Sequence, residues 1–222
     1  MPVMDEFRKE REELKQKGLK EKLSYFIYYY KWHTLAVIAV AAMIISIVTN
    51  IVTRKDCAFY VCLLNTLDAP QAEDYVQSFA EYAGIDTKQY DVTFDTTMTI
   101  RGDGRDELSI GTYQRLTVYT AAGDMDAIVA PPEILEIYTN EQVFYDLRDL
   151  LTSEEVSLYE PYFYYADQET GDSIPVGIHL VNCQTFKENF LLGSDDMIVA
   201  VYINSKNVET AVKFIEFIMQ EP

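Results

Sequence analysis

The residues that most often carry catalysis and metal binding are scarce in this chain of 222 residues, which has only two histidines and three cysteines. They do not cluster at the spacing of a zinc site. The chain also contains no G-x-S-x-G, P-loop or dinucleotide-binding glycine motif. His179 lies in the strand-like stretch VGIHLVN, where a lone histidine is more often structural than catalytic. The sequence therefore predicts no catalytic residue, no metal site and no cofactor, and we do not expect an enzyme.

Basic residues are also in short supply: 18 Lys and Arg stand against 36 Asp and Glu, a net charge of −18. The shortage is uneven. Residues 1–33 hold eight basic and six acidic residues, a net of +2, whereas residues 34–222 hold ten and thirty, a net of −20. So acidic a surface does not neutralise nucleic-acid phosphates, and anionic lipid head groups repel it. Nucleic acid is therefore excluded as a partner.

What the sequence does contain is one long apolar run, residues 34–53, with 20 residues and no charged side chain. As a helix it would be about 30 Å long, the thickness of a bilayer's hydrocarbon core. A core helix of a soluble protein is one alternative, but apolar runs of this length are rare there. Aromatic residues that favour the membrane–water interface precede the run, namely Tyr25, Tyr28, Tyr29, Tyr30 and Trp32.

A cleaved export signal is the second alternative to a permanent anchor. The run is longer than the roughly 7–15 apolar residues of a signal peptide, and VTNIVTRKD offers no small-residue cleavage site. We therefore expect an uncleaved transmembrane helix over residues 34–53, with the bilayer as its partner. Because the basic excess precedes it, residues 1–33 are expected to form a cytoplasmic, charged juxtamembrane helix, and residues 56–222 an extracytoplasmic domain.

The extracytoplasmic part alternates stretches typical of strands with stretches typical of helices. Asp68 is the expected N-cap of a helix that ends at Gly84, and another helix is expected over residues 109–122, ending at Gly123. Residues 143–167 are expected to be helical or loop-like. Strands are expected at residues 57–65, 90–95, 127–130, 174–183 and 196–204, and further helices from Pro131 to about Asn140 and after Asn207. The pattern predicts an α/β domain with a mostly parallel sheet flanked by helices.

The three cysteines are expected to be buried free thiols, since three do not make a disulfide framework. Cys57 and Cys62 lie in one expected strand, too far apart for a bridge to each other. Either could pair with Cys183, and the sequence leaves that pairing open.

Part of the chain resembles the extracellular solute-binding proteins of ATP-driven importers, a type II periplasmic-binding-protein-like family. The resemblance rests on DMDAIVAPPEILEIYTNEQVFYDLRDLL, IPVGIHL and VYINSKNVETAVKFIEFIMQ, and it follows the order of elements from Cys57 to Gln220. It implies that family's fold, a role in transport and an importer permease as a partner. The chain is shorter than the family, because only about 22 residues separate Leu151 from Ile174, where much of a second lobe would lie. One lobe, or a reduced second lobe, is therefore expected.

Ligands of such α/β sheets bind at the carboxyl ends of the strands, beside helix N-termini. Two functions follow. The chain is a membrane-anchored binding module for a small solute or peptide, or it is a structural or regulatory subunit that binds another envelope protein without a small-molecule ligand. Packing against the core is the alternative use of the tyrosines near residue 160. The expected ligand-binding residues are Asn65 and Thr66 after the first strand, Ala130, Pro131 and Glu133 after AIVA, and Tyr162, Tyr164 and Tyr165 as an aromatic wall.

Overall fold

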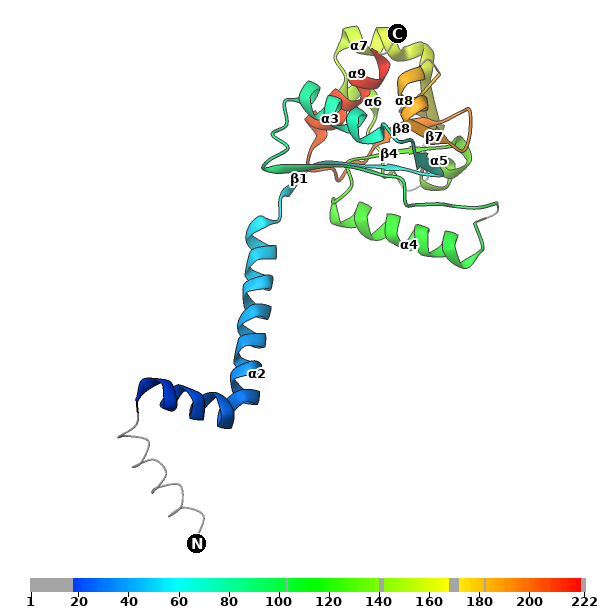
Figure 1. The fold of residues 1–222 in the computed structure, drawn as a ribbon. Helices are drawn as coiled ribbons and strands as arrows, with labels where there is room; N and C mark the ends of the chain where they lie inside the picture. The colour runs from blue at the N-terminus through cyan, green and yellow to red at the C-terminus, as the bar shows by residue number, and fades with distance from the viewer. Residues whose placement is uncertain (1–17, 103, 140–141, 168–171, 182, 221–222) are drawn as a thin grey trace. The chain divides into compact units, whose positions relative to one another are not determined.

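The computed structural model describes residues 18–102, 104–139, 142–167, 172–181 and 183–220, so the expected cytoplasmic segment falls partly outside these ranges. The chain divides into two compact units between Arg54 and Lys55. The first unit contains the expected anchor, and the second contains every described strand (Figure 1).

The described part of the first unit is a helix, α2 (Leu19–Thr53), of 35 residues. Its segment Trp32–Thr53 has a mean hydropathy of 2.6, and its most apolar window is not buried against the protein. The hydroxyls of Thr49 and Thr53 donate to carbonyls four residues earlier, at 2.8 and 2.7 Å, so these polar groups are satisfied within the helix. Among the described residues this is the single helix long and apolar enough to cross a membrane, and it contains the expected span 34–53.

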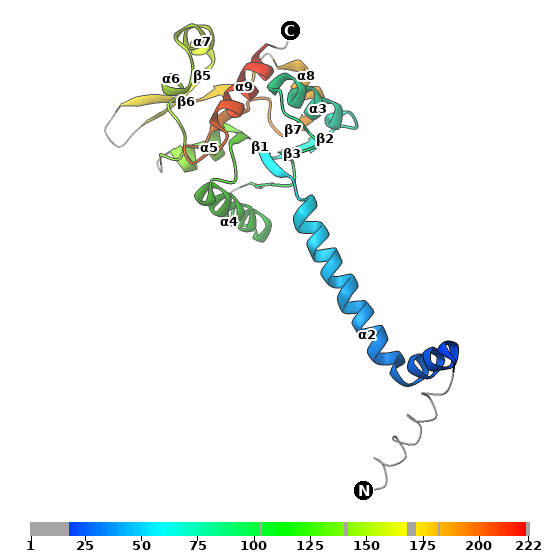
Figure 2. The same cartoon turned by 90° about the vertical axis from the view of Figure 1, so that its left-hand side faces the viewer.

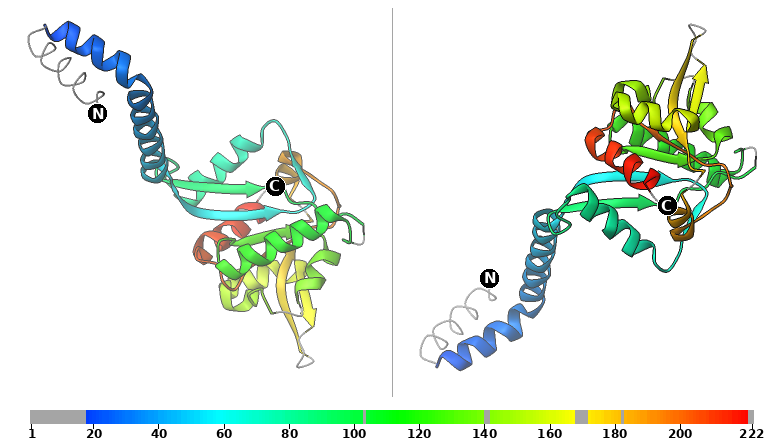
Figure 3. Two further views of the ribbon diagram at one scale, coloured as in Figure 1. Left: turned by 90° about the horizontal axis from the view of Figure 1, so that it is seen from below. Right: turned by 90° about the horizontal axis from the view of Figure 1, so that it is seen from above.

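The second unit is built on a six-stranded sheet (Figures 1 and 3). In spatial order the strands are β3 (Tyr90–Asp95), β1 (Asp56–Leu63), β4 (Ala127–Ala130), β8 (Ile198–Val201), β6 (Ser173–His179) and β5 (Phe163–Asp167). β1 is parallel to β3 and β4, whereas β8 is antiparallel to β4 and β6, and β5 is antiparallel to β6. Four of the six strands, β3, β1, β4 and β6, therefore point one way. The expected α/β domain with a mostly parallel sheet is confirmed in strand direction, although three of the five neighbouring pairs are antiparallel.

Helices cover both faces of the sheet (Figures 1 and 3). One face carries α3 (Ala72–Ala83), α8 (Gln184–Asn189) and α9 (Val208–Met219), and the opposite face carries α4 (Glu107–Ala122) and α5 (Pro132–Thr139). The connection from α5 to β5 contains α6 (Leu147–Leu150), α7 (Ser153–Tyr159) and a 3-10 turn, Glu160–Tyr162. A separate antiparallel ribbon pairs β2 (Thr66–Asp68) with β7 (Phe190–Leu192).

β1 is buried on both sides because its alternate residues enter two different hydrophobic clusters. Phe59 and Leu63 belong to the cluster under α3 and α9, and Cys62 belongs to the cluster under α4 and α5. The ring of Phe59 lies 5.2 Å from that of Phe79 on α3 and 5.0 Å from that of Phe214 on α9. This aromatic packing holds both helices on the same strand.

Most of the expected elements are confirmed, but one helix start is wrong. Gly84 and Gly123 end α3 and α4 in the left-handed conformation, with φ of 76° and 63°. Asp68 is not the N-cap of α3, because it lies in β2 and accepts the hydroxyl of Thr96 at 3.0 Å. α3 begins only at Ala72.

The stretch 143–167, expected to be helical or loop-like, also contains a strand, β5. A register shift between Tyr164 and Tyr165 interrupts its pairing with β6. The extra residue lies on β6, where Val176 and Ile178, only two residues apart, enter the two different clusters, whereas Phe163 and Ala166 of β5 keep the regular alternation of a strand.

All three cysteines are free thiols, as expected. Cys62 and Cys183 are buried, but the expectation of burial is wrong for Cys57, which is exposed near the start of β1.

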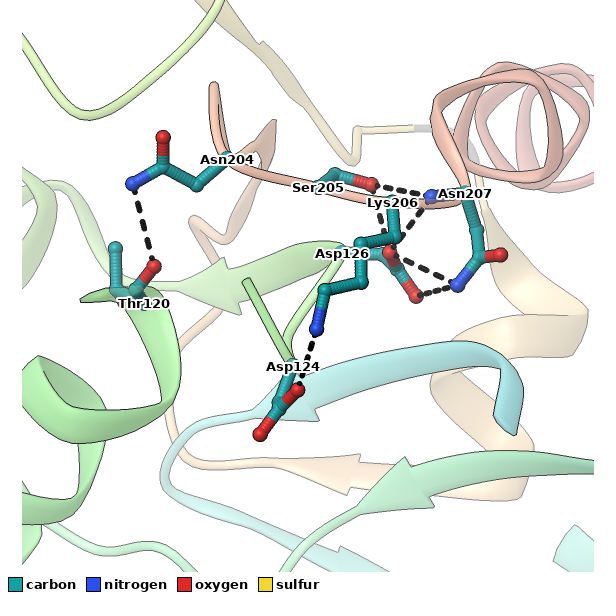
Figure 4. A network of polar contacts seen from close by, with 7 residues as sticks. All are labelled: Thr120, Asp124, Asp126, Asn204, Ser205, Lys206 and Asn207. Atoms are coloured by element: carbon teal, nitrogen blue, oxygen red, sulfur yellow. Dashed lines mark hydrogen bonds and ion pairs between the residues drawn. The ribbon is translucent and has the colours of Figure 1, made fainter. Parts of the chain in front are cut away.

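A buried carboxylate joins several elements at the amino end of β4 (Figure 4). Asp126 is 1% exposed and accepts the backbone N–H of Tyr60 at 2.8 Å, the hydroxyl of Ser205 at 2.6 Å and the side-chain amide of Asn207 at 3.2 Å. Asn207 precedes α9, and its side chain contacts Asp126 rather than capping that helix. The stretches DMD and NSKN, far apart in the sequence, therefore meet in one polar network.

Replacing this carboxylate is expected to be strongly destabilising. Asp126→Ala leaves several buried donors without an acceptor, so we expect it to lower the free energy of unfolding by roughly 3–5 kcal/mol. The matched control is Asp124→Ala, which removes an exposed 2.8 Å ion pair to Lys206 and should cost less than about 1 kcal/mol. Urea unfolding of the full-length chain in detergent, monitored by the circular dichroism of its tyrosines, measures both losses of unfolding free energy. Equal losses would contradict the assignment.

Candidate functional site

The carboxyl ends of β1, β4 and β6 lie together at one end of the main sheet, at the tips of its strands. Leu63 is in register with Val129, and Ile198 of β8 is in register with both Ala130 and His179. The expected ligand-binding residues after β1 and β4 therefore do lie at one edge, as the sequence predicted.

The polar groups of the residues after β1 are already used within the fold. Asn65 adopts a left-handed φ of 57°, and its side-chain oxygen accepts the N–H of Ile100 at 2.8 Å. Its own N–H donates to the carbonyl of Met98 at 3.1 Å. Thr66 is buried, and its hydroxyl donates to the carbonyl of Leu63 at 2.8 Å. Asn65 therefore holds the segment after β3 against the sheet, whereas Thr66 bonds back to the end of β1.

The residues after β4 differ in their exposure. Ala130 and Pro131 are buried, where Pro131 accepts the first hydrogen bonds of α5 through its carbonyl, and Glu133 on α5 is exposed. Of the five residues expected around the two strand ends, Glu133 is the one whose polar side chain is exposed to solvent.

The three expected tyrosines do not form one wall. Tyr162 packs against the cluster under α3 and α9, whereas Tyr164 packs against the cluster on the opposite face of the sheet. Tyr165 is 47% exposed and lies 6.3 Å from the ring of Phe163. Of the three expected tyrosines, only Tyr164, at the start of β5, lies close enough to Glu133 on α5 for the charge of that carboxylate to act on it.

Tyr164 belongs to an acidic cluster that the sequence did not reveal. Its ring lies edge-on to His179 at 5.7 Å, and the Nδ1 atom of His179 lies 2.7 Å from a carboxylate oxygen of Asp196. Burial raises the pKa of Tyr164, and the negative charges of Glu136, Glu133 and Asp196 raise it further. Among the residues that the structure describes, no group of three or more His, Cys, Asp or Glu could hold a metal ion.

Elsewhere, residues of α3 and of the outer strand β3, two elements labelled in Figure 2, line an open groove. This α3–β3 groove has a volume of about 400 Å³, within the ~300–1,000 Å³ range of ligand pockets. Five consecutive residues of β3, residues 90–94, line it, which shows that the groove follows the edge of the strand rather than one of its faces. Its apolar lining includes Val76, Ala80, Phe94 and Phe190.

Charged side chains surround this apolar lining. Asp68, Glu73 and Asp91 line the groove together with one basic residue, Lys55. The ammonium group of Lys55 donates to the carbonyl of Thr87 at 2.6 Å and lies 3.7 Å from Asp91. The groove therefore has an excess of negative charge. The sequence could not reveal it, because only the strand order places β3 at the edge of the sheet.

A second polar cluster closes the carboxyl end of β3. Asp95 is 9% exposed and accepts the hydroxyl of Tyr60 and both the N–H and the hydroxyl of Thr97, the latter two at 2.8 and 2.6 Å. Arg115 of α4 lies 3.6 Å away. Burial alone would raise the pKa of Asp95, but the hydrogen bonds from Thr97 and Tyr60 and the charge of Arg115 hold it below its usual value. Burial and the bond to Asp95 raise the pKa of the Tyr60 hydroxyl.

Comparison of the chain with protein-family models, with curated proteins and with solved structures finds no match.

The depressed pKa of Asp95 predicts how stability changes with pH. A carboxylate with a folded-state pKa below its ordinary 3.8 stabilises the fold above that pH, and the stabilisation is lost as the pH falls through the folded-state value. The free energy of unfolding of the native chain should therefore exceed that of Asp95→Asn at pH 6, and the difference should shrink below about pH 4. Urea titrations at pH 6, 4, 3 and 2 measure it. A difference independent of pH would contradict an ionised Asp95 in this cluster.

Proposed function

We propose that the chain is a membrane-anchored, extracytoplasmic binding module that holds another protein of the cell envelope. The observation that carries the proposal is the α3–β3 groove, which is open, acidic at its rim and aligned with the edge of a sheet. Such an edge binds an extended polypeptide more naturally than a compact solute, because its backbone groups repeat along one direction.

The carboxyl edge of the sheet gives weaker support to a small-solute site. The polar side chains of Asn65 and Thr66 form hydrogen bonds within the protein, and Ala130 is buried. The part of the second unit that the structure describes has one main sheet, so a ligand held by closure of two lobes has no support there. The resemblance to solute-binding proteins and their transport role remains a prediction.

Small-solute binding is a second candidate function, supported by one observation. Glu133, Tyr164 and the His179–Asp196 pair lie together at the carboxyl edge, and polar groups of this kind bind amino acids and sugars. A thermal-shift panel of amino acids, sugars and short peptides distinguishes the candidates. Stabilisation by a solute that Tyr164→Ala abolishes and Glu73→Gln leaves intact would favour the solute site over the groove.

The proposed orientation places the second unit outside the cytoplasm. It is supported by the apolar segment Trp32–Thr53 and by the basic excess that precedes it in the sequence. Cys57 offers a direct test because it lies just beyond this segment and is exposed, whereas Cys62 and Cys183 are buried.

A membrane-impermeant maleimide should label one thiol per chain in intact cells and three after denaturation. Although the residue is exposed, neighbouring protein atoms partly desolvate its thiol and, together with the charge of Asp126, raise the pKa of Cys57, so labelling should be slow at pH 7 and faster at pH 8.5. The control variant Cys57→Ser should not be labelled before denaturation. Labelling of Cys57 only after the cells are opened would place the domain in the cytoplasm and contradict the proposal.

Site-specific photo-crosslinking tests the groove as the binding site. Gln77 and Ser78 are exposed neighbours on α3, but only Gln77 lines the groove. A benzoyl-phenylalanine in place of Gln77, in the full-length chain in its own membrane, should form a discrete crosslink to a second protein, with the crosslinked peptide identified by mass spectrometry. The same group in place of Ser78 should form this crosslink at least several-fold less. Equal yields at both positions, or crosslinks to lipid alone, would contradict the proposal.

A further inference from the structure

We infer that the groove takes an extended, basic segment of its partner, which adds to the sheet as a seventh strand beside β3. This inference rests on the proposed function and specifies the chemistry of the bound segment: a strand with alternating apolar side chains and with Lys or Arg between them.

The edge of the sheet supports strand addition. β3 is the first strand in the spatial order, and among the described strands it pairs only with β1. An outer strand of this kind presents N–H and C=O groups along its free side, and another chain can pair with them. Its six residues extend for about 20 Å. Because residues 90–94 line the groove without a break, a bound chain would follow the backbone of β3 itself.

The lining of the groove supports alternating apolar side chains in the bound segment. Val92 and Phe94 are two residues apart on β3, both line the groove, and both pack against the cluster under α3. Val76 on α3 also lines the groove and is only partly buried, whereas the groove-lining Ala72 and Ala80 are small and buried. In an added strand, every second side chain would point toward this lining and the others would point away from it.

The charges at the rim select a basic segment. Asp68, Glu73 and Asp91 line the groove, whereas the single cation, Lys55, already donates to the carbonyl of Thr87. The domain beyond the anchor is also strongly acidic, since residues 34–222 carry a net charge of −20. A second copy of this chain would bring the same acidic edge to the groove, and an acidic peptide would be repelled.

Defined peptides test the inference with the full-length chain in nanodiscs of zwitterionic lipid. A labelled seven-residue peptide of alternating Lys and Val should bind, and its affinity should fall as salt rises. The Glu–Val analogue should not bind. Methylation of the backbone nitrogens of one alternate set of residues should abolish binding, and methylation of the other set should leave it nearly unchanged, because only one set faces β3. Loss of affinity with both sets, or with neither, would overturn strand addition.

Two neighbouring acids provide a matched pair of variants. Glu73 and Asp74 both lie in the first turn of α3 and are exposed, but only Glu73 lines the groove. Glu73→Lys should weaken binding of the Lys–Val peptide roughly three- to tenfold, since it turns an attraction across the rim into a repulsion. Asp74→Lys makes the same change of charge and should weaken it less than about twofold. Equal effects would show that the overall charge, not the groove, attracts the peptide.

The two proposals can fail separately. If Gln77 crosslinks to a partner whose crosslinked peptide is acidic, or if binding ignores backbone methylation, the groove holds a protein but not a basic added strand. If no protein crosslinks at Gln77 although the Lys–Val peptide binds with the expected pattern, the mode of binding is correct and the proposed envelope partner is wrong.

Discussion

The hydrogen bonds to the buried carboxylate of Asp126 are the interaction on which the rest of the second unit depends. The carboxylate accepts hydrogen bonds from β1, from the turn after β8 and from Asn207 at the start of α9. α9 then carries Phe214, whose ring lies 5.2 Å from that of Phe94 on β3 and 5.4 Å from that of Phe79 on α3. Aromatic packing on α9 therefore contacts both walls of the groove, β3 and α3, and the hydrogen bonds of Asp126 hold the start of that helix.

Elements with a strong local signal could be predicted from the sequence. The apolar run of β1, the AIVA strand and the glycines after α3 and α4 act through periodicity and backbone conformation, which neighbouring residues determine. β2 and β7 have three residues each and are stabilised only by pairing with one another, so no local pattern marks them. Asp68 looked like a helix cap for the same reason, since its place in β2 depends on distant residues.

The candidate sites show the same division. The rule that ligands meet the carboxyl ends of strands correctly grouped Asn65 with Pro131, because strand direction follows from the α/β pattern. Whether a polar group at that edge is available is a different question. The hydrogen bonds of Asn65 to the segment after β3 come from tertiary structure. The groove could not be predicted from the sequence at all, because it depends on the strand order. It exists only because β3 has β1 on one side and no described strand on the other.

If a partner strand adds to β3 as proposed, the shortness of that strand limits the affinity, and the membrane anchor would offset this limit. Only alternate residues of a six-residue strand point outward, and each backbone hydrogen bond contributes about 0.5–1.5 kcal/mol net, which does not greatly exceed the entropy lost on association. Affinity in free solution would therefore be modest. If the chain is anchored as proposed, a partner confined to the same membrane would meet the groove at a much higher effective concentration, so a weak and selective contact would be sufficient. The acidic surface would add to the selectivity of the proposed contact, because it would repel acidic chains while the acidic rim of the groove would attract basic ones.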